Sequence, residues 1–77
     1  MDKSIYRKEY RDLIALLIEA RKNNNLKQSD VAKKLKISQQ DVSKYENLIR
    51  RLDIIEFLEI CSVLNIDYQK ELAKIKF

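Results

Sequence analysis

The sequence predicts an all-α protein, a compact five-helix bundle, and two observations lead to this prediction. The 77 residues include no glycine and no proline, which disfavours the tight turns of β-hairpins and leaves a helical bundle as the simplest architecture. Hydrophobic residues make up 45% and charged residues 36% of the chain, and the apolar positions recur with a helical period. A chain of this length is expected to form one domain, residues 1–77.

The first helix is expected over about residues 3–22. Its apolar residues form two stripes, which implies burial on more than one side. Either the helix lies deep between its neighbours, or part of its surface meets a second subunit. A helix lying on a membrane is a third alternative, because Arg7, Lys8 and Arg11 flank the apolar face, although three acidic residues dilute that charge. The stripes consist of Tyr6, Tyr10, Leu13, Leu17 and Ala20, and of Ile14 and Ile18.

Residues 28–47 have the pattern of two short amphipathic helices joined by a tight turn, a helix-turn-helix. Ser29, or less well Lys27, can cap the first of the two, which ends at Leu35. Ser38 supplies the cap of the second. The apolar positions are Val31, Ala32 and Leu35 in the first, and Val42 and Tyr45 in the second.

The second helix of this pair has a polar outer face formed by Gln39, Gln40, Ser43 and Lys44, with only Asp41 as an acid. Glutamine can pair bidentately with adenine, and lysine favours the acceptor atoms of guanine. Such side chains on the first turns of a short helix are typical of a helix that reads base edges in a major groove. The alternative is an ordinary solvated helix face.

Over about residues 13–72 the chain resembles the phage repressor and Cro-type (Xre-like) helix-turn-helix regulators of bacteria and their mobile elements. The resemblance implies that family's DNA-binding bundle. Its most specific features are a glutamine that opens the second helix, an alanine within it, and a Ser-x-Tyr-Glu-Asn-like end to the third. The matching residues are Arg21, Leu26-Lys27-Gln28, Val31-Ala32, Leu35, Ile37-Ser38, Val42 to Asn47 and Arg50 to Asp53.

The resemblance also implies roles for these positions. Arg21 and Glu46 form a buried ion pair that ties the first helix to the recognition helix. The expected base contacts are Gln39, Gln40, Ser43 and Lys44. The expected phosphate contacts are Gln28, Ser38, Asn47, Arg50 and Arg51, with solvated surface arginine as the alternative for the last two.

Four turns deserve comparison with glycine, which family members usually have at the position of Asn25. Two of these positions, Asn25 and Asn65, are asparagines, and asparagine is the non-glycine residue type that best tolerates a left-handed conformation. Lys36, between the paired helices, and Leu48, after the recognition helix, tolerate it less well. If both keep a positive φ, each costs about 1 kcal/mol, and replacing Lys36 by glycine should then stabilise the protein.

The remaining chain is predicted to form a basic loop and two helices. The loop covers residues 48–52. Within it, Leu48 or Ile49 either contacts a neighbouring subunit or packs under the loop. Asp53 caps the fourth helix, with Glu56 at the spacing of a capping box; its expected core residues are Ile54, Ile55, Phe57, Leu58, Ile60, Cys61 and Leu64. Asp67 caps a last helix, over about residues 68–75. The apolar edge of this helix either covers the core or forms a dimer interface. It consists of Tyr68, Leu72, Ile75 and Phe77.

The composition argues against an enzyme, since the chain has no histidine, no glycine-rich phosphate loop and no nucleophile beside a base. Cys61 is the only cysteine, which argues against a structural zinc site and is consistent with a reducing cytoplasm. Its thiol is expected to be buried and inert. We expect no cofactor, metal, small-molecule ligand or membrane partner.

A net charge of +4 and a pI near 9.3 fit a polyanionic partner. The leading hypothesis is a sequence-specific, double-stranded DNA-binding transcription regulator, a repressor that acts as a homodimer on a palindromic operator. The second hypothesis is a helical protein-interaction module, such as an antitoxin or adaptor, that binds a partner protein.

Overall fold

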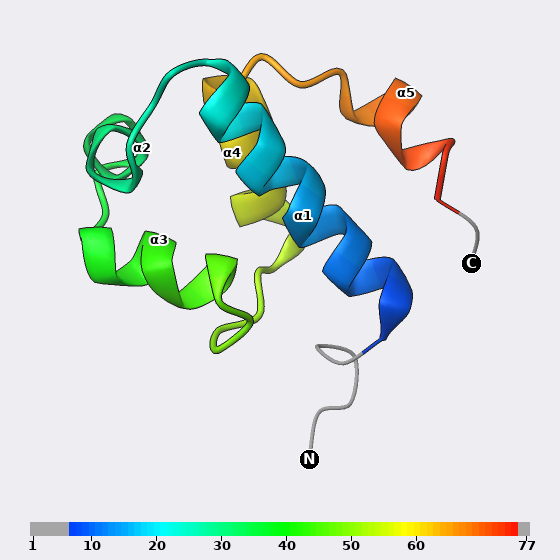
Figure 1. The fold of residues 1–77 in the computed structure, drawn as a ribbon, viewed down its shortest axis with the longest axis horizontal. Helices are drawn as coiled ribbons and strands as arrows, with labels where there is room; N and C mark the ends of the chain where they lie inside the picture. Colours follow the sequence, from blue (N-terminus) through cyan, green and yellow to red (C-terminus); the bar gives the residue numbers. More distant parts are fainter. Residues whose placement is uncertain (1–6, 76–77) are drawn as a thin grey trace.

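Five α-helices follow one another in the computed structural model, which describes residues 7–75 (Figure 1). No strand occurs among the residues described, so the predicted all-helical fold with five helices is confirmed. The helices are α1 (Lys8–Asn23), α2 (Gln28–Leu35), α3 (Gln39–Glu46), α4 (Ile54–Val63) and α5 (Tyr68–Leu72).

The first and last helices differ from the predicted spans. Arg7, which was expected inside the first helix, has extended backbone angles (φ −72°, ψ 143°) and precedes α1. The part of that prediction covering residues 3–6 lies outside the described residues, as does Phe77. Helix α5 ends at Leu72, and Ile75 belongs to the turn that follows. A helix of five residues has few internal hydrogen bonds to sustain it, and the exposed Ala73 and Lys74 add no packing.

The helix starts follow local capping chemistry. The side chains of Ser38, Asp53 and Asp67 accept backbone N–H groups in the first turns of α3, α4 and α5, at 3.1, 2.8 and 3.3 Å. These three predicted caps are confirmed. The expected Ser29 cap is wrong, because Lys27 is the residue before α2 and Ser29 lies inside the helix. There the Asp30 carboxylate accepts the Lys27 N–H at 2.8 Å, which satisfies a free donor at the helix start without a serine.

The first four helices all end in the same hydrogen-bonded turn. At the end of α2, Ile37 N–H donates to Ala32 O (3.0 Å) and Lys36 N–H donates to Lys33 O (3.2 Å), the pair of bonds that defines a Schellman motif. The conditional prediction of a positive φ is confirmed at every such turn. The left-handed residues are Asn25, Lys36, Leu48 and Asn65, with φ of 57°, 59°, 61° and 56°.

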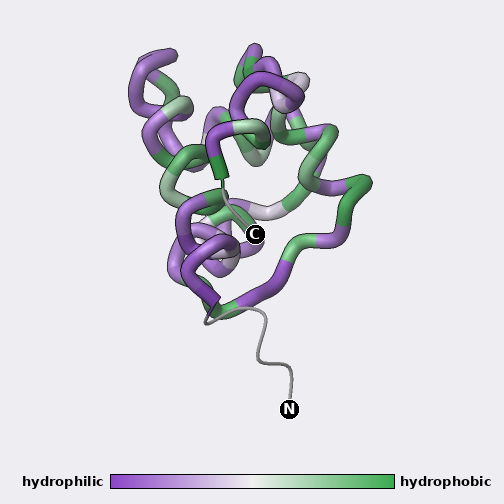
Figure 2. The backbone as a smooth tube through the Cα atoms, turned by 90° about the vertical axis from the view of Figure 1, so that its right-hand side faces the viewer, coloured by the Kyte–Doolittle hydropathy of each residue, from purple (hydrophilic) through white to green (hydrophobic). Residues whose placement is uncertain are grey.

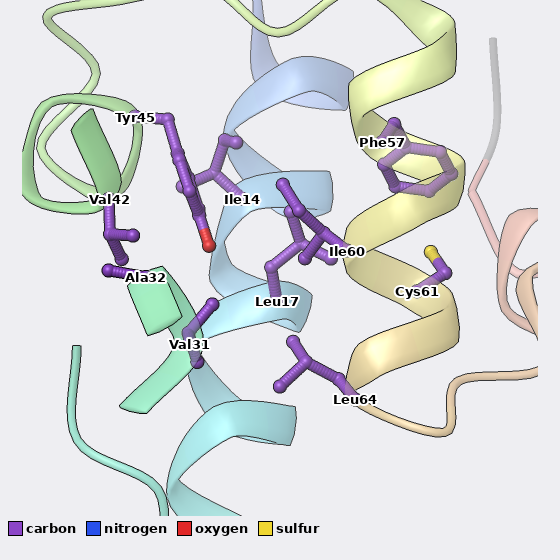
Figure 3. Packing of buried hydrophobic residues seen from close by; sticks show 10 residues of the cluster. All are labelled: Ile14, Leu17, Val31, Ala32, Val42, Tyr45, Phe57, Ile60, Cys61 and Leu64. Carbon is purple, nitrogen blue, oxygen red and sulfur yellow. The ribbon is translucent and has the colours of Figure 1, made fainter. Parts of the chain in front are cut away.

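One hydrophobic core joins the first four helices (Figure 3). Its buried members are Ile14, Leu17, Val31, Ala32, Val42, Tyr45, Phe57, Ile60, Cys61 and Leu64. The expected burial of Cys61 is confirmed. Ile54 and Ile55, also expected in the core, are instead 64% and 62% exposed. The apolar pattern begins in the first turn of α4, but the first buried residue of this helix is Phe57.

Helices α2 and α3 pack against each other on one side of the molecule, and α1 and α4 lie beside them (Figure 1). Leu17 and Ile14, one from each apolar stripe of α1, are both buried, so α1 lies deep in the bundle. Helix α5 places Leu72 against the edge of the core. Hydrophobic and hydrophilic residues interleave along the helices (Figure 2), as expected where each helix buries one face.

Candidate nucleic-acid interface

Helix α3 buries one face and exposes the other. Its buried residues are Val42, Tyr45 and Glu46, and Figure 3 shows Val42 and Tyr45 pointing toward the core. Gln39, Gln40 and Lys44 are exposed, whereas Ser43 is half-buried. Gln40 and Lys44 are four residues apart and therefore neighbours on the helix surface, with Gln39 beside them at the N-terminal end. Three polar side chains thus share one accessible surface.

A buried ion pair fixes α3 to α1. Arg21 Nε donates to Glu46 Oε2 at 2.7 Å, and Arg21 Nη2 donates to Glu46 Oε1 at 3.0 Å. The two side chains are only 13% and 5% exposed. Arg21 Nη1 also donates to the carbonyl of Leu26 at 2.9 Å. The fork-to-fork geometry constrains both distance and orientation, so α3 cannot rotate against α1 without breaking several hydrogen bonds.

Gln28, the first residue of α2, also bonds to this carboxylate. Its Nε2 donates to Glu46 Oε1 at 3.0 Å, so α1, α2 and α3 meet at one side chain. An amide nitrogen carries two hydrogens, and the second remains compatible with the phosphate contact expected of Gln28. The bond to Glu46 was not predicted.

Two other expected contact residues are bonded within α3. Asn47 Nδ2 donates to the carbonyl and the hydroxyl oxygen of Ser43, at 2.9 and 3.1 Å. The Asn47 side chain therefore closes the end of α3 in this structure, and it would have to leave Ser43 to donate to a phosphate. Ser38 accepts the N–H of Asp41 through its oxygen, which leaves its hydroxyl hydrogen able to donate.

The two arginines of the loop after α3 differ in exposure. The Arg50 guanidinium donates to the Glu56 carboxylate, and that hydrogen bond raises the Arg50 pKa further above its ordinary value. Arg50 is half-buried, whereas Arg51 is exposed. The phosphate contact expected of Arg50 would therefore have to come from a guanidinium that already donates to Glu56.

Charge is distributed unevenly along the chain. Residues 27–51, which include α2, α3 and the loop, contain seven basic and three acidic residues. Residues 52–75 contain two basic and five acidic ones. One of the three acids in the first group, Glu46, is buried and neutralised by Arg21. Residues 27–51 therefore carry the net positive charge that attracts a polyanion, and it comes from Lys27, Lys36, Arg50 and Arg51, which flank α2 and α3.

The described residues offer little other chemistry. Burial raises the pKa of the Cys61 thiol to about 11, so it stays protonated and is a poor nucleophile near neutral pH. No cluster of His, Cys, Asp or Glu within residues 7–75 could hold a metal ion. In the same range no helix has the length and apolar character needed to cross a membrane.

Helices α2 and α3, their short connection and the polar outer face of α3 define a helix-turn-helix protein. A family model for the Cro/C1-type (Xre-like) helix-turn-helix matches residues 17–70. The chain belongs to this family of DNA-binding transcription regulators, and the resemblance inferred from the sequence is confirmed. Comparisons with curated proteins and with solved structures gave no match.

Proposed function

We propose that the protein binds double-stranded DNA sequence-specifically and acts as a transcriptional repressor, with α3 in the major groove. The observation that carries the proposal is the pairing of an exposed polar face, Gln39, Gln40 and Lys44, with an inner face locked by Arg21 and Glu46. A helix held in place from behind loses little backbone entropy on binding.

The outer face of α3 supplies the base contacts in this proposal. Gln39 and Gln40 suit adenine, whose N6 and N7 match a side-chain amide, and Lys44 suits the guanine acceptors. Ser43 is half-buried and accepts from Asn47, so it contacts the groove only through its hydroxyl hydrogen. We therefore expect Gln39, Gln40 and Lys44 to determine most of the base preference.

Phosphate contacts come from the start of α2, the start of α3 and the following loop. Gln28 and Ser38 each retain a hydrogen to donate beside a helix N-terminus, where backbone amides also favour an anion. Arg51 is exposed in the basic loop. Asn47 joins them if its amide exchanges Ser43 for a phosphate. These contacts set the register of α3 in the groove without reading sequence themselves.

We propose that two copies bind one palindromic operator. A single small module makes few base contacts, and specific affinity in the nanomolar range needs more. Two copies related by a two-fold axis would place their α3 helices in successive major grooves, about 34 Å apart. Repression requires only that the bound dimer occupies a site that the transcription machinery needs.

Selection of binding sequences from random double-stranded DNA tests the proposal. We expect an enriched palindrome with half-site centres one helical turn apart, and an affinity that falls steeply as salt rises. A single unrepeated half-site would contradict the dimer but retain DNA reading. No enrichment, with weak binding of equal strength to all fragments, would instead favour the protein-interaction module.

A further inference from the structure

The loop between α3 and α4 is held from outside by two side chains. Tyr10 of α1 accepts the N–H of Leu52 on its hydroxyl oxygen, at 3.0 Å. Glu56 of α4 accepts the N–H of Asp53 on Oε1, at 3.0 Å, and the Arg50 guanidinium on Oε2. Backbone groups and one arginine of the loop are therefore fastened to two different helices.

Glu56 has two functions at this point. It completes the capping box at the start of α4, in which Asp53 accepts the N–H of Glu56 at 2.8 Å, and it neutralises Arg50. The two side chains are 39% and 31% exposed, so the pair lies at the surface beside the basic loop. Whether Arg50 left Glu56 or used its other N–H groups for a phosphate, the Glu56 carboxylate would lie close to that phosphate and repel it.

We infer that Arg50 and Tyr10 are positioning residues for the DNA contact rather than phosphate ligands, and that the phosphate contact of this loop comes from Arg51, whose side chain is exposed. The inference rests on the proposed DNA-binding function and refines it. Arg50, through Glu56, and Tyr10, through Leu52, hold the loop backbone in place before DNA arrives. A loop ordered in advance loses less conformational entropy on binding.

The salt dependence of DNA affinity separates the two roles. Each phosphate contact contributes about 0.9 to the slope of log affinity against log salt. Arg51→Gln should therefore lower the slope by about one unit. Arg50→Gln should weaken binding about two- to fivefold, as expected for loss of a surface ion pair, at every salt concentration and with an unchanged slope. A slope that falls by about one unit in Arg50→Gln would overturn the inference.

Glu56→Gln is the matched variant, because glutamine can still serve in a capping box while the charge is lost. A positioning role predicts weaker binding with an unchanged slope, and no further loss when Arg50→Gln is added. If Glu56 only repels DNA, Glu56→Gln should bind more tightly, which contradicts the inference. Tyr10→Phe, which removes a single acceptor, should resemble Arg50→Gln.

Amide hydrogen exchange distinguishes failure of this inference from failure of the proposed function. The proposed function fails if the wild-type protein shows no salt-dependent binding to any DNA. The loop can still be examined in that case, since exchange at the Leu52 and Asp53 amides reports its order directly. Faster exchange in Tyr10→Phe and Arg50→Gln supports the positioning role, and unchanged exchange contradicts it.

Discussion

The two faces of α3 are built on opposite principles. On the inner face, Glu46 accepts hydrogen bonds from Arg21 and Gln28 and is 9% exposed. On the outer face, Gln39 and Gln40 are solvent-exposed. The inner face determines where the helix lies, and the outer face determines what it can contact. Substitutions on the two faces should therefore separate into losses of stability and changes of binding.

The largest effect is expected from Glu46→Ala. The substitution leaves the Arg21 guanidinium buried without its carboxylate, which typically costs about 3–5 kcal/mol. Urea unfolding measures this as a fall in the midpoint with little change in slope. Glu59→Ala, at an exposed position of α4, is the control and should change stability by less than about 0.5 kcal/mol.

Glu46→Gln provides a second comparison if the alanine variant does not fold. Glutamine keeps one acceptor oxygen for Arg21 but loses the charge, so an intermediate loss is expected. If both variants lose less than about 1 kcal/mol, the ion pair does not hold α3 in place and the contrast between the faces fails.

Smaller effects are expected at the left-handed residues on either side of α3. Lys36 is exposed and has a positive φ, so burial of its side chain contributes little to offset the cost of the left-handed backbone. Lys36→Gly should stabilise the protein by about 0.5–1 kcal/mol, measured as a rise in Tm. A fall in Tm would show that the turn depends on the lysine side chain. Lys36→Asn is the control and should give a smaller rise.

Leu48 has the same backbone conformation but a different environment. Its side chain packs against the core, and burying half of a leucine side chain is worth about 1 kcal/mol, similar to the cost of the left-handed backbone. Leu48→Gly should therefore change the Tm little, in contrast to Lys36→Gly. An equal rise in both variants would mean that packing of Leu48 contributes nothing.

The smallest change in stability is expected on the outer face. Gln40 is exposed, and Gln40→Ala should alter the free energy of unfolding by less than about 0.5 kcal/mol. Thermal or urea unfolding of the variant checks this. A loss above about 1 kcal/mol would place Gln40 in the structure of the bundle and remove the basis for assigning it to DNA.

Features governed by neighbouring residues could be predicted from the sequence. The caps at Ser38 and Asp53 and the left-handed turns at Asn25 and Asn65 depend on a few residues around each helix end, and the structure contains all of them. The Ser29 cap failed because Asp30 offered a competing acceptor for the same helix start.

Contacts between distant residues could not be predicted from the spacing of residues alone, and the Arg21–Glu46 pair was expected only from the family resemblance. Arg50 and Glu56 lie six positions apart across a loop, and Tyr10 bonds to a residue 42 positions away. No helical or strand period links such pairs, so only the folded backbone brings them together. Ile54 similarly has the spacing of a core residue, and its exposure depends on which helices cover the start of α4.

The assignment of base reading to the outer face of α3 is tested most directly by the DNA affinities of Gln40→Ala and Arg51→Ala, measured on the selected operator and on a scrambled duplex. Gln40→Ala should weaken operator binding and leave scrambled DNA unaffected, because it removes a base contact worth about 1–3 kcal/mol. Arg51→Ala should weaken both by a similar factor. Equal losses on both duplexes in both variants would contradict the assignment of base reading to the outer face of α3.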